Sequence, residues 1–178
     1  MGTLLIVLLI LGTIGIIIFS WWFSIKDKRY HGIYRFFAFE CLFILVLLNW
    51  HTWFKDAFSI HQIFSWIFLI ASMIPAFYGF YLLKKMGKPE GKLENTSQLV
   101  VSGIYRYIRH PLYGSLVLLG IGIYLKGPLD IMNIVLCIVN TIALFATAKV
   151  EEKEMIQRFG SEYKEYMKIT KMFIPFVL

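Results

Sequence analysis

Residues 4–23 read LLIVLLILGTIGIIIFSWWF, a run of twenty side chains that carries no charge. At about 1.5 Å rise per residue, a helix of this length crosses the roughly 30 Å hydrocarbon core of a bilayer. Lys26, Lys28 and Arg29 follow the run, whereas a cleaved signal peptide carries its positive charge before the apolar stretch. We therefore predict a retained membrane helix near the N-terminus.

Four further apolar stretches follow. We predict spans at 36–54, 60–83 and 131–148, and a shorter apolar segment at 112–125, which must tilt or thin the bilayer to cross it. The last span continues into a charged helical segment at 149–159. The sequence therefore predicts an all-α integral membrane protein with five transmembrane helices and short cytosolic helices at its C-terminal end.

The composition supports this fold class. Hydrophobic residues make up 58% of the 178 residues and charged residues 16%, against about 45–50% and 25% in soluble domains, which excludes a separate water-soluble catalytic domain. The net charge of +7 comes mainly from Lys and Arg beside apolar runs, so it indicates membrane topology rather than nucleic-acid binding. Of these cations, only Lys55 and Lys126 fall on the outer side of a topology with an outer N-terminus and a cytosolic C-terminus.

The chain is predicted to form one membrane domain, 1–178. Its N-terminal part, 1–83, holds three helices, and its second part, 84–178, holds a helical hairpin at 112–148 and the cytosolic C-terminal helices. The two cysteines lie inside apolar runs and the histidines lack ligand spacing, so neither a disulfide framework nor a metal site is expected.

Two polar segments lie on the predicted cytosolic face. The first, residues 99–114, reads LVVSGIYRYIRHPLYG, and Pro111 should force His110 out of helical geometry at the edge of the membrane. The second, residues 150–166, reads VEEKEMIQRFGSEYKEY; within it Glu154 and Arg158 have the spacing of a helical ion pair, and Gly160 can end the helix. From composition alone, an interfacial aromatic belt is the alternative explanation of the first segment, and a solvated charged face is that of the second.

These two segments together resemble the isoprenylcysteine carboxyl methyltransferase family. The likeness is carried by Ser102–Tyr105 and Arg109–Tyr113, then by Glu151-Glu152, Phe159-Gly160, Tyr163 and Tyr166, and by the ending Ile174-Pro175-Phe176. The resemblance implies an enzyme that binds S-adenosylmethionine where the motifs meet, releases S-adenosylhomocysteine, and methylates the C-terminal carboxylate of an isoprenylcysteine or a similar lipid-tailed acceptor. It further implies a multi-pass protein of a prokaryotic cell membrane with a cytosolic active site.

The resemblance also implies the site residues. The cofactor contacts fall on Leu99, Val100, Tyr105, His110, Pro111, Leu112, Tyr113 and Glu151. Glu151 can hold the cofactor's ammonium group, His110 can donate to its carboxylate or ribose, and a tyrosine ring can face its cation or stack on its base. No metal is implied.

One position departs from the family pattern. Relatives that methylate prenylcysteine carry an Arg four residues before the first Glu of the pair, and this chain has Thr147 at that substrate-binding position. Lys149, Arg106 or Arg109 would then supply the positive charge for the acceptor. Glu152 is the candidate base if the acceptor is an amine, because an amine arrives protonated. The alternatives are a phospholipid N-methyltransferase, a sterol-reductase-like NADPH enzyme, and a transporter or scaffold without enzymatic activity.

Overall fold

A computed structural model of the protein describes residues 2–89 and 96–174, and the regular elements in these ranges are helices. The long helices are α1 (Gly2–Phe23), α2 (His31–Asn49), α3 (Ile60–Met86), α4 (Pro111–Tyr124) and α5 (Ile131–Phe159), followed by the short α6 (Ser161–Ile169). Single turns of 3-10 helix lie at Ile25–Asp27, Trp50–Thr52 and Gly103–Arg106.

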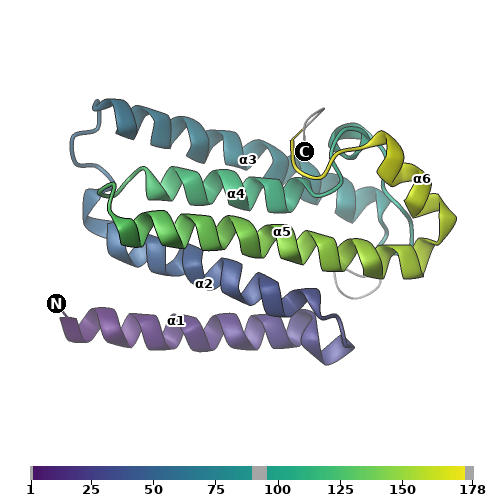
Figure 1. Cartoon of the computed structure of the whole chain (residues 1–178), viewed down its shortest axis with the longest axis horizontal. Helices are drawn as coiled ribbons and strands as arrows, with labels where there is room; N and C mark the ends of the chain where they lie inside the picture. The colour runs from purple at the N-terminus through teal and green to yellow at the C-terminus, as the bar shows by residue number, and fades with distance from the viewer. Residues whose placement is uncertain (1, 90–95, 175–178) are drawn as a thin grey trace.

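The long helices lie side by side in the order α3, α4, α5, α2, α1, which differs from their order in the chain (Figure 1). α4 packs mainly against α3, α5 packs mainly against α2, and α1 contacts α2 at the edge of the bundle. The buried core between α2, α4 and α5 includes Ala38, Leu45, Leu144 and Ala148. At one end of the bundle α5 continues past α4 and turns into α6 (Figure 1).

Within residues 2–89 and 96–174, four helices are long and apolar enough to cross a membrane: α1, extended to Asp27, α2, extended to Thr52, α3 and α5. Large apolar side chains are exposed along their outer faces, and in α1 only Ser20 is buried. This is the surface expected of helices that face lipid. The fourteen-residue α4 is shorter than a full span, so the fifth crossing and the orientation of the bundle stay predictions.

Helix boundaries follow the predictions closely, with one correction. α2 begins at His31 and ends at Asn49, so the predicted span at 36–54 was placed too late. At this end the buried Asn49 amide donates to the carbonyl of Leu45 and to Asn133 Oδ1, the Thr52 hydroxyl donates back to the carbonyl of Asn49, and the chain continues as a 3-10 turn at Trp50–Thr52. Residues 90–95 of the predicted loop, and Pro175 and Phe176 of the family-like ending, lie outside the described residues.

The first turn of α4 sits close against α3 because Gly79 carries no side chain. A Cβ atom at Gly79 would lie 3.0 Å from Cγ of Pro111, tighter than an ordinary contact. Pro111 occupies the first helical position of α4, where its missing N–H costs nothing. The close approach places the 99–114 segment directly beside the C-terminal half of α3.

Candidate active site

His110 stands at the junction between a non-helical segment and α4. Its backbone angles are φ −122° and ψ 62°, which confirms that Pro111 keeps it out of the helix. The backbone N–H groups of Arg109 and His110 donate to the carbonyls of Lys171 and Met172 at 2.8 and 3.0 Å, and Lys171 N–H donates to the carbonyl of Tyr107 at 3.0 Å. The segment after α6 therefore braces the 107–110 segment.

A buried ion pair joins the two motifs. Arg109 Nε and Nη2 each lie 2.8 Å from Oε1 of Glu152, and the two side chains are only 8% and 4% exposed. Nη1 of Arg109 also donates to the carbonyls of Thr170 and Met167. Because the guanidinium is fully engaged by these groups, Arg109 holds the site together and is poorly placed to bind a substrate.

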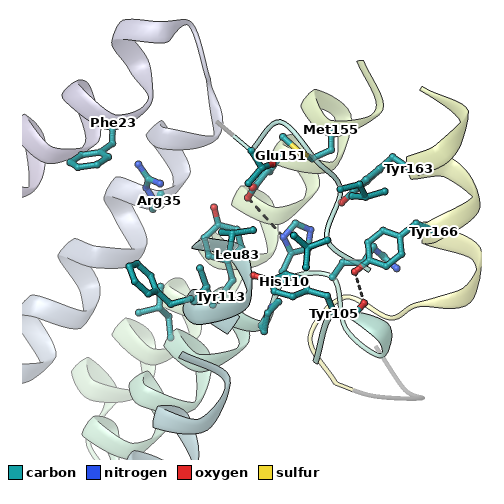
Figure 2. A pocket seen from close by; sticks show the side chains of 18 of the residues that line it. Phe23, Arg35, Leu83, Tyr105, His110, Tyr113, Glu151, Met155, Tyr163 and Tyr166 are labelled. Atoms are coloured by element: carbon teal, nitrogen blue, oxygen red, sulfur yellow. Dashed lines mark hydrogen bonds and ion pairs between the residues drawn. The ribbon is translucent and has the colours of Figure 1, made fainter. Parts of the chain in front are cut away.

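A cavity of about 410 Å³ lies where the two motifs meet (Figure 2). Its volume is within the range of small-molecule and cofactor sites, about 300–1,000 Å³. All eight residues that the resemblance assigns to the cofactor line this cavity: Leu99, Val100, Tyr105, His110, Pro111, Leu112, Tyr113 and Glu151. The structure therefore brings together residues that are up to 52 positions apart in the sequence.

The polar groups of the cavity match the chemistry of S-adenosylmethionine. Oε2 of Glu151 lies 3.9 Å from Nδ1 of His110, and the His110 ring stacks on Tyr113 with centroids 5.5 Å apart. Nε2 of His110 is buried, makes no hydrogen bond within 3.5 Å among the described residues, and faces Oε1 of Glu152 at 3.7 Å. A carboxylate for an ammonium group, an aromatic surface for a cation or base, and an imidazole for a carboxylate or ribose are thus present on one wall.

Two tyrosines of α6 close the cavity on another side (Figure 2). The hydroxyl of Tyr166 donates to the carbonyl of Tyr105 at 2.6 Å, and the Tyr163 and Tyr166 rings meet edge to face. Burial and the nearby charge of Glu151 raise the pKa of both Tyr105 and Tyr163 well above the ordinary phenol value. These phenols therefore stay protonated and act as hydrogen-bond donors.

The sequence did not indicate the part of the cavity wall that comes from α1, α2 and α3. Phe19 and Phe23 of α1, Arg35 and Phe39 of α2, and Phe80 of α3 line it. Their common sequence signal is weak, because aromatic residues are frequent throughout this chain. The remaining lining residues are Leu83, Thr96, Arg109, Leu116, Met155, Phe159, Tyr163 and Tyr166; of these the resemblance named Arg109, Phe159 and the two tyrosines without assigning them to the cofactor.

Three other predicted residues lie away from the cavity. Thr147 is fully buried in α5, where its hydroxyl donates to the carbonyl of Ala143 at 2.7 Å, and it is not among the lining residues. Glu152 lies behind the wall, paired with Arg109. Glu154 was predicted to pair with Arg158. Instead, its carboxylate binds Arg29 and His31, at and just after the turn between α1 and α2. Among the described residues no cluster of His, Cys, Asp or Glu is arranged to hold a metal ion.

Comparison with known proteins places the chain among membrane methyltransferases. The family model described as phospholipid methyltransferase matches residues 60–162, more than half of the chain. Three curated relatives carry the name methanethiol S-methyltransferase. That of Crocosphaera subtropica is 26% identical over 172 residues, covering 89% of this chain and 66% of the relative.

The other two relatives match a shorter stretch. Those of Bradyrhizobium diazoefficiens and Pseudomonas deceptionensis are 28% and 25% identical over 72 residues, or 40% of this chain. The chain spans less than two thirds of the length of its curated relatives, and in these two the matched part is 24% and 26% of the relative. No solved structure matches the chain significantly.

Proposed function

The chain belongs to the phospholipid methyltransferase family, and from this premise we propose that it transfers a methyl group from S-adenosylmethionine to an acceptor that enters from the membrane. The observation that carries the proposal is the meeting of the 99–114 segment and the start of the α5 extension at one cavity, with Glu151 and Tyr113 on the same wall. An interfacial belt alone does not account for a cavity enclosed between these residues.

The proposed donor site uses residues of both motifs. Glu151 holds the ammonium group, His110 donates to the carboxylate or ribose, and Tyr105 or Tyr113 faces the cation or the base. When bound, the donor supplies an activated methyl group on a sulfonium sulfur. The task of the protein is then to align the acceptor with that group and to exclude water.

For the acceptor we propose the C-terminal carboxylate of an isoprenylcysteine or of a similar lipid-tailed molecule. A carboxylate is ionised at neutral pH and needs no general base. A phospholipid amine needs one, and its candidate base, Glu152, is occupied by two N–H groups of Arg109. A thiol is the second candidate acceptor, because all three curated relatives are named for methanethiol. The site is proposed to lie on the cytosolic side of a prokaryotic membrane.

The test uses the protein purified in detergent. Calorimetric titration with S-adenosylhomocysteine should show binding, and titration with NADPH should not. The purified protein should then transfer a radiolabelled methyl group to an N-acetylated S-farnesylcysteine or, for the second candidate, to methanethiol. Binding of NADPH instead of the nucleoside would contradict the proposal in favour of a reductase, and binding of neither would favour a protein without enzymatic activity.

A further inference from the structure

Tyr163 is a buried tyrosine in the cavity wall. It lies in the first turn of α6, is 3% exposed, and lines the cavity beside Met155 (Figure 2). Within residues 2–89 and 96–174, its hydroxyl makes no hydrogen bond. Burying a hydroxyl without a partner is unfavourable, and a ligand in the cavity that accepts its hydrogen bond would remove this cost.

The two neighbouring phenols already donate to the backbone. The hydroxyl of Tyr166 donates to the carbonyl of Tyr105 at 2.6 Å, and that of Tyr105 donates to the carbonyl of Gly79 at 3.4 Å. Burial, and after it the charge of Glu151, raises the pKa of Tyr163, so its hydroxyl keeps its proton at neutral pH. Tyr163 therefore offers the cavity a neutral hydrogen-bond donor.

The part of the cavity around Tyr163 has apolar walls, and we call it the α6 end. The ring of Tyr163 meets that of Tyr166 with centroids 5.8 Å apart and an angle of 64° between the planes, and both rings pack in one buried cluster with Met155. Two further side chains pack on this cluster and line the cavity, Leu99 and Phe159. These groups suit a flat ring that has apolar faces and a polar edge.

The α6 end lies beyond Glu151 along α5. Glu151, Met155 and Phe159 are spaced four residues apart and share one face of the helix, so the latter two lie about 6 and 12 Å further along its axis. The opposite end of the cavity carries Phe23 and other side chains of the membrane helices α1 to α3 (Figure 2). An acceptor from the membrane reaches that end first, which leaves the α6 end to the water-soluble donor.

We propose that the α6 end binds the adenine ring of the methyl donor, and that the hydroxyl of Tyr163 donates a hydrogen bond to an unprotonated nitrogen of that ring. This inference rests on the proposed methyl transfer. With the ammonium group on Glu151, the adenine ring is the part of the donor that is furthest along its chain of bonds. A neutral ring nitrogen suits Tyr163 better than the donor's carboxylate does, because the nearby charges of Glu151 and Glu152 repel an anion and Arg109 is bound to Glu152.

The test measures binding of ligands that differ from S-adenosylhomocysteine in one ring atom. In its 1-deaza, 3-deaza and 7-deaza analogues, a C–H group replaces one ring nitrogen and removes one hydrogen-bond acceptor. Calorimetric titration of the detergent-purified full chain compares wild type with Tyr163→Phe, which keeps the ring and removes the hydroxyl. Y163F should bind S-adenosylhomocysteine about 3- to 10-fold more weakly, as expected for one neutral hydrogen bond.

The analogues assign this effect to one atom. One of them should bind wild type and Y163F equally, because it lacks the acceptor, and the other two should lose the same factor as S-adenosylhomocysteine. The control Tyr34→Phe, which removes an exposed phenol of α2 outside the cavity, should bind all four ligands like wild type. Equal binding of S-adenosylhomocysteine by wild type and Y163F, or an equal loss for all four ligands, would overturn the inference.

Thermal unfolding of the ligand-free protein tests whether the Tyr163 hydroxyl has a partner inside the protein. Y163F should unfold at the temperature of wild type or above it, because it loses a buried polar group that makes no hydrogen bond. Tyr166→Phe should unfold at a lower temperature, because the carbonyl of Tyr105 loses its donor. A fall for Y163F as large as that for Y166F would also overturn the inference.

Failure of this inference can be told apart from failure of the proposed function. If wild type binds S-adenosylhomocysteine but the expected pattern among the analogues is absent, the proposed function stands and the role of Tyr163 is wrong. If wild type does not bind S-adenosylhomocysteine, the proposed function fails and the inference fails with it.

Discussion

Replacing Glu151 with Gln tests the assignment of this carboxylate to the ammonium group of the methyl donor. Gln keeps the size of the side chain and removes its charge, while the contact between Arg109 and Glu152 that braces the wall stays in place. A charge-assisted hydrogen bond contributes about 1.5 to 3 kcal/mol. Because the Glu151 side chain is 19% exposed, solvent screens part of this contribution, so we expect about 1.5 to 2 kcal/mol, or roughly 10- to 30-fold in Kd.

The assay is calorimetric titration of the detergent-purified protein with S-adenosylhomocysteine at neutral pH, which avoids any dependence on the acceptor. The matched control is E162Q, which removes a carboxylate from an exposed position in the first turn of α6. The control should bind like wild type, because Glu162 does not line the cavity. If E151Q also binds like wild type, the carboxylate does not meet the ammonium group and the reasoning from the cavity wall is refuted.

Three further predictions concern stability. Glu152→Gln leaves the buried guanidinium of Arg109 without its counter-charge, which should cost about 3 to 5 kcal/mol of stability. The temperature of thermal unfolding should therefore fall. An unchanged temperature would argue against a bracing role of this ion pair. Gly160 has φ +58° and ψ −127° with open space around it, so Gly160→Ala should lower the free energy of unfolding by about 1 to 3 kcal/mol through backbone strain alone. The control Gly15→Ala, equally open but within α1, should not lower it. Equal denaturation midpoints for the two variants would contradict this prediction. Burial raises the pKa of Tyr105, so this phenol ionises at lower pH in the unfolded chain, and the stability of the fold should decline as the pH rises past about 10. Tyr105→Phe should make that decline smaller in denaturant titrations at a series of pH values. An equal decline in wild type and variant would show that this phenol does not cause it.

Local chemistry made much of the fold predictable. The uncharged run at 4–23 reappears as α1, and the span predicted at 131–148 continues without a break to Phe159 as α5. Pro111 starts α4 and Gly160 ends α5 in a backbone conformation that other residues rarely adopt. Each of these features depends on a few neighbouring residues, and the sequence displays those residues directly.

Pairings over long distances could not be predicted in the same way. The sequence offers Arg158 to Glu154, since the two are four residues apart, but the folded chain brings His31 and Arg29 to it from more than 120 residues away. Arg35 has the appearance of one more positive charge beside a membrane span, and only the packing of α1 and α2 shows that it lines the cavity. The order of the helices in the bundle, which the apolar runs do not encode, decides both outcomes.

The candidate site could be predicted only in part. Composition and spacing alone allowed an interfacial belt, and the resemblance, rather than any periodicity, singled out the eight residues that meet at the cavity. Thr147 was assigned by its register in the motif, but register does not show which way a helix faces, and its side chain is buried in the core of the bundle.

The most direct test of the central claim is an experimental structure of the protein with S-adenosylhomocysteine. We expect one nucleoside in the cavity, in contact with both Glu151 on α5 and a ring of the 105–113 segment. A nucleoside bound elsewhere, or one that touches only one of the two segments, would contradict it.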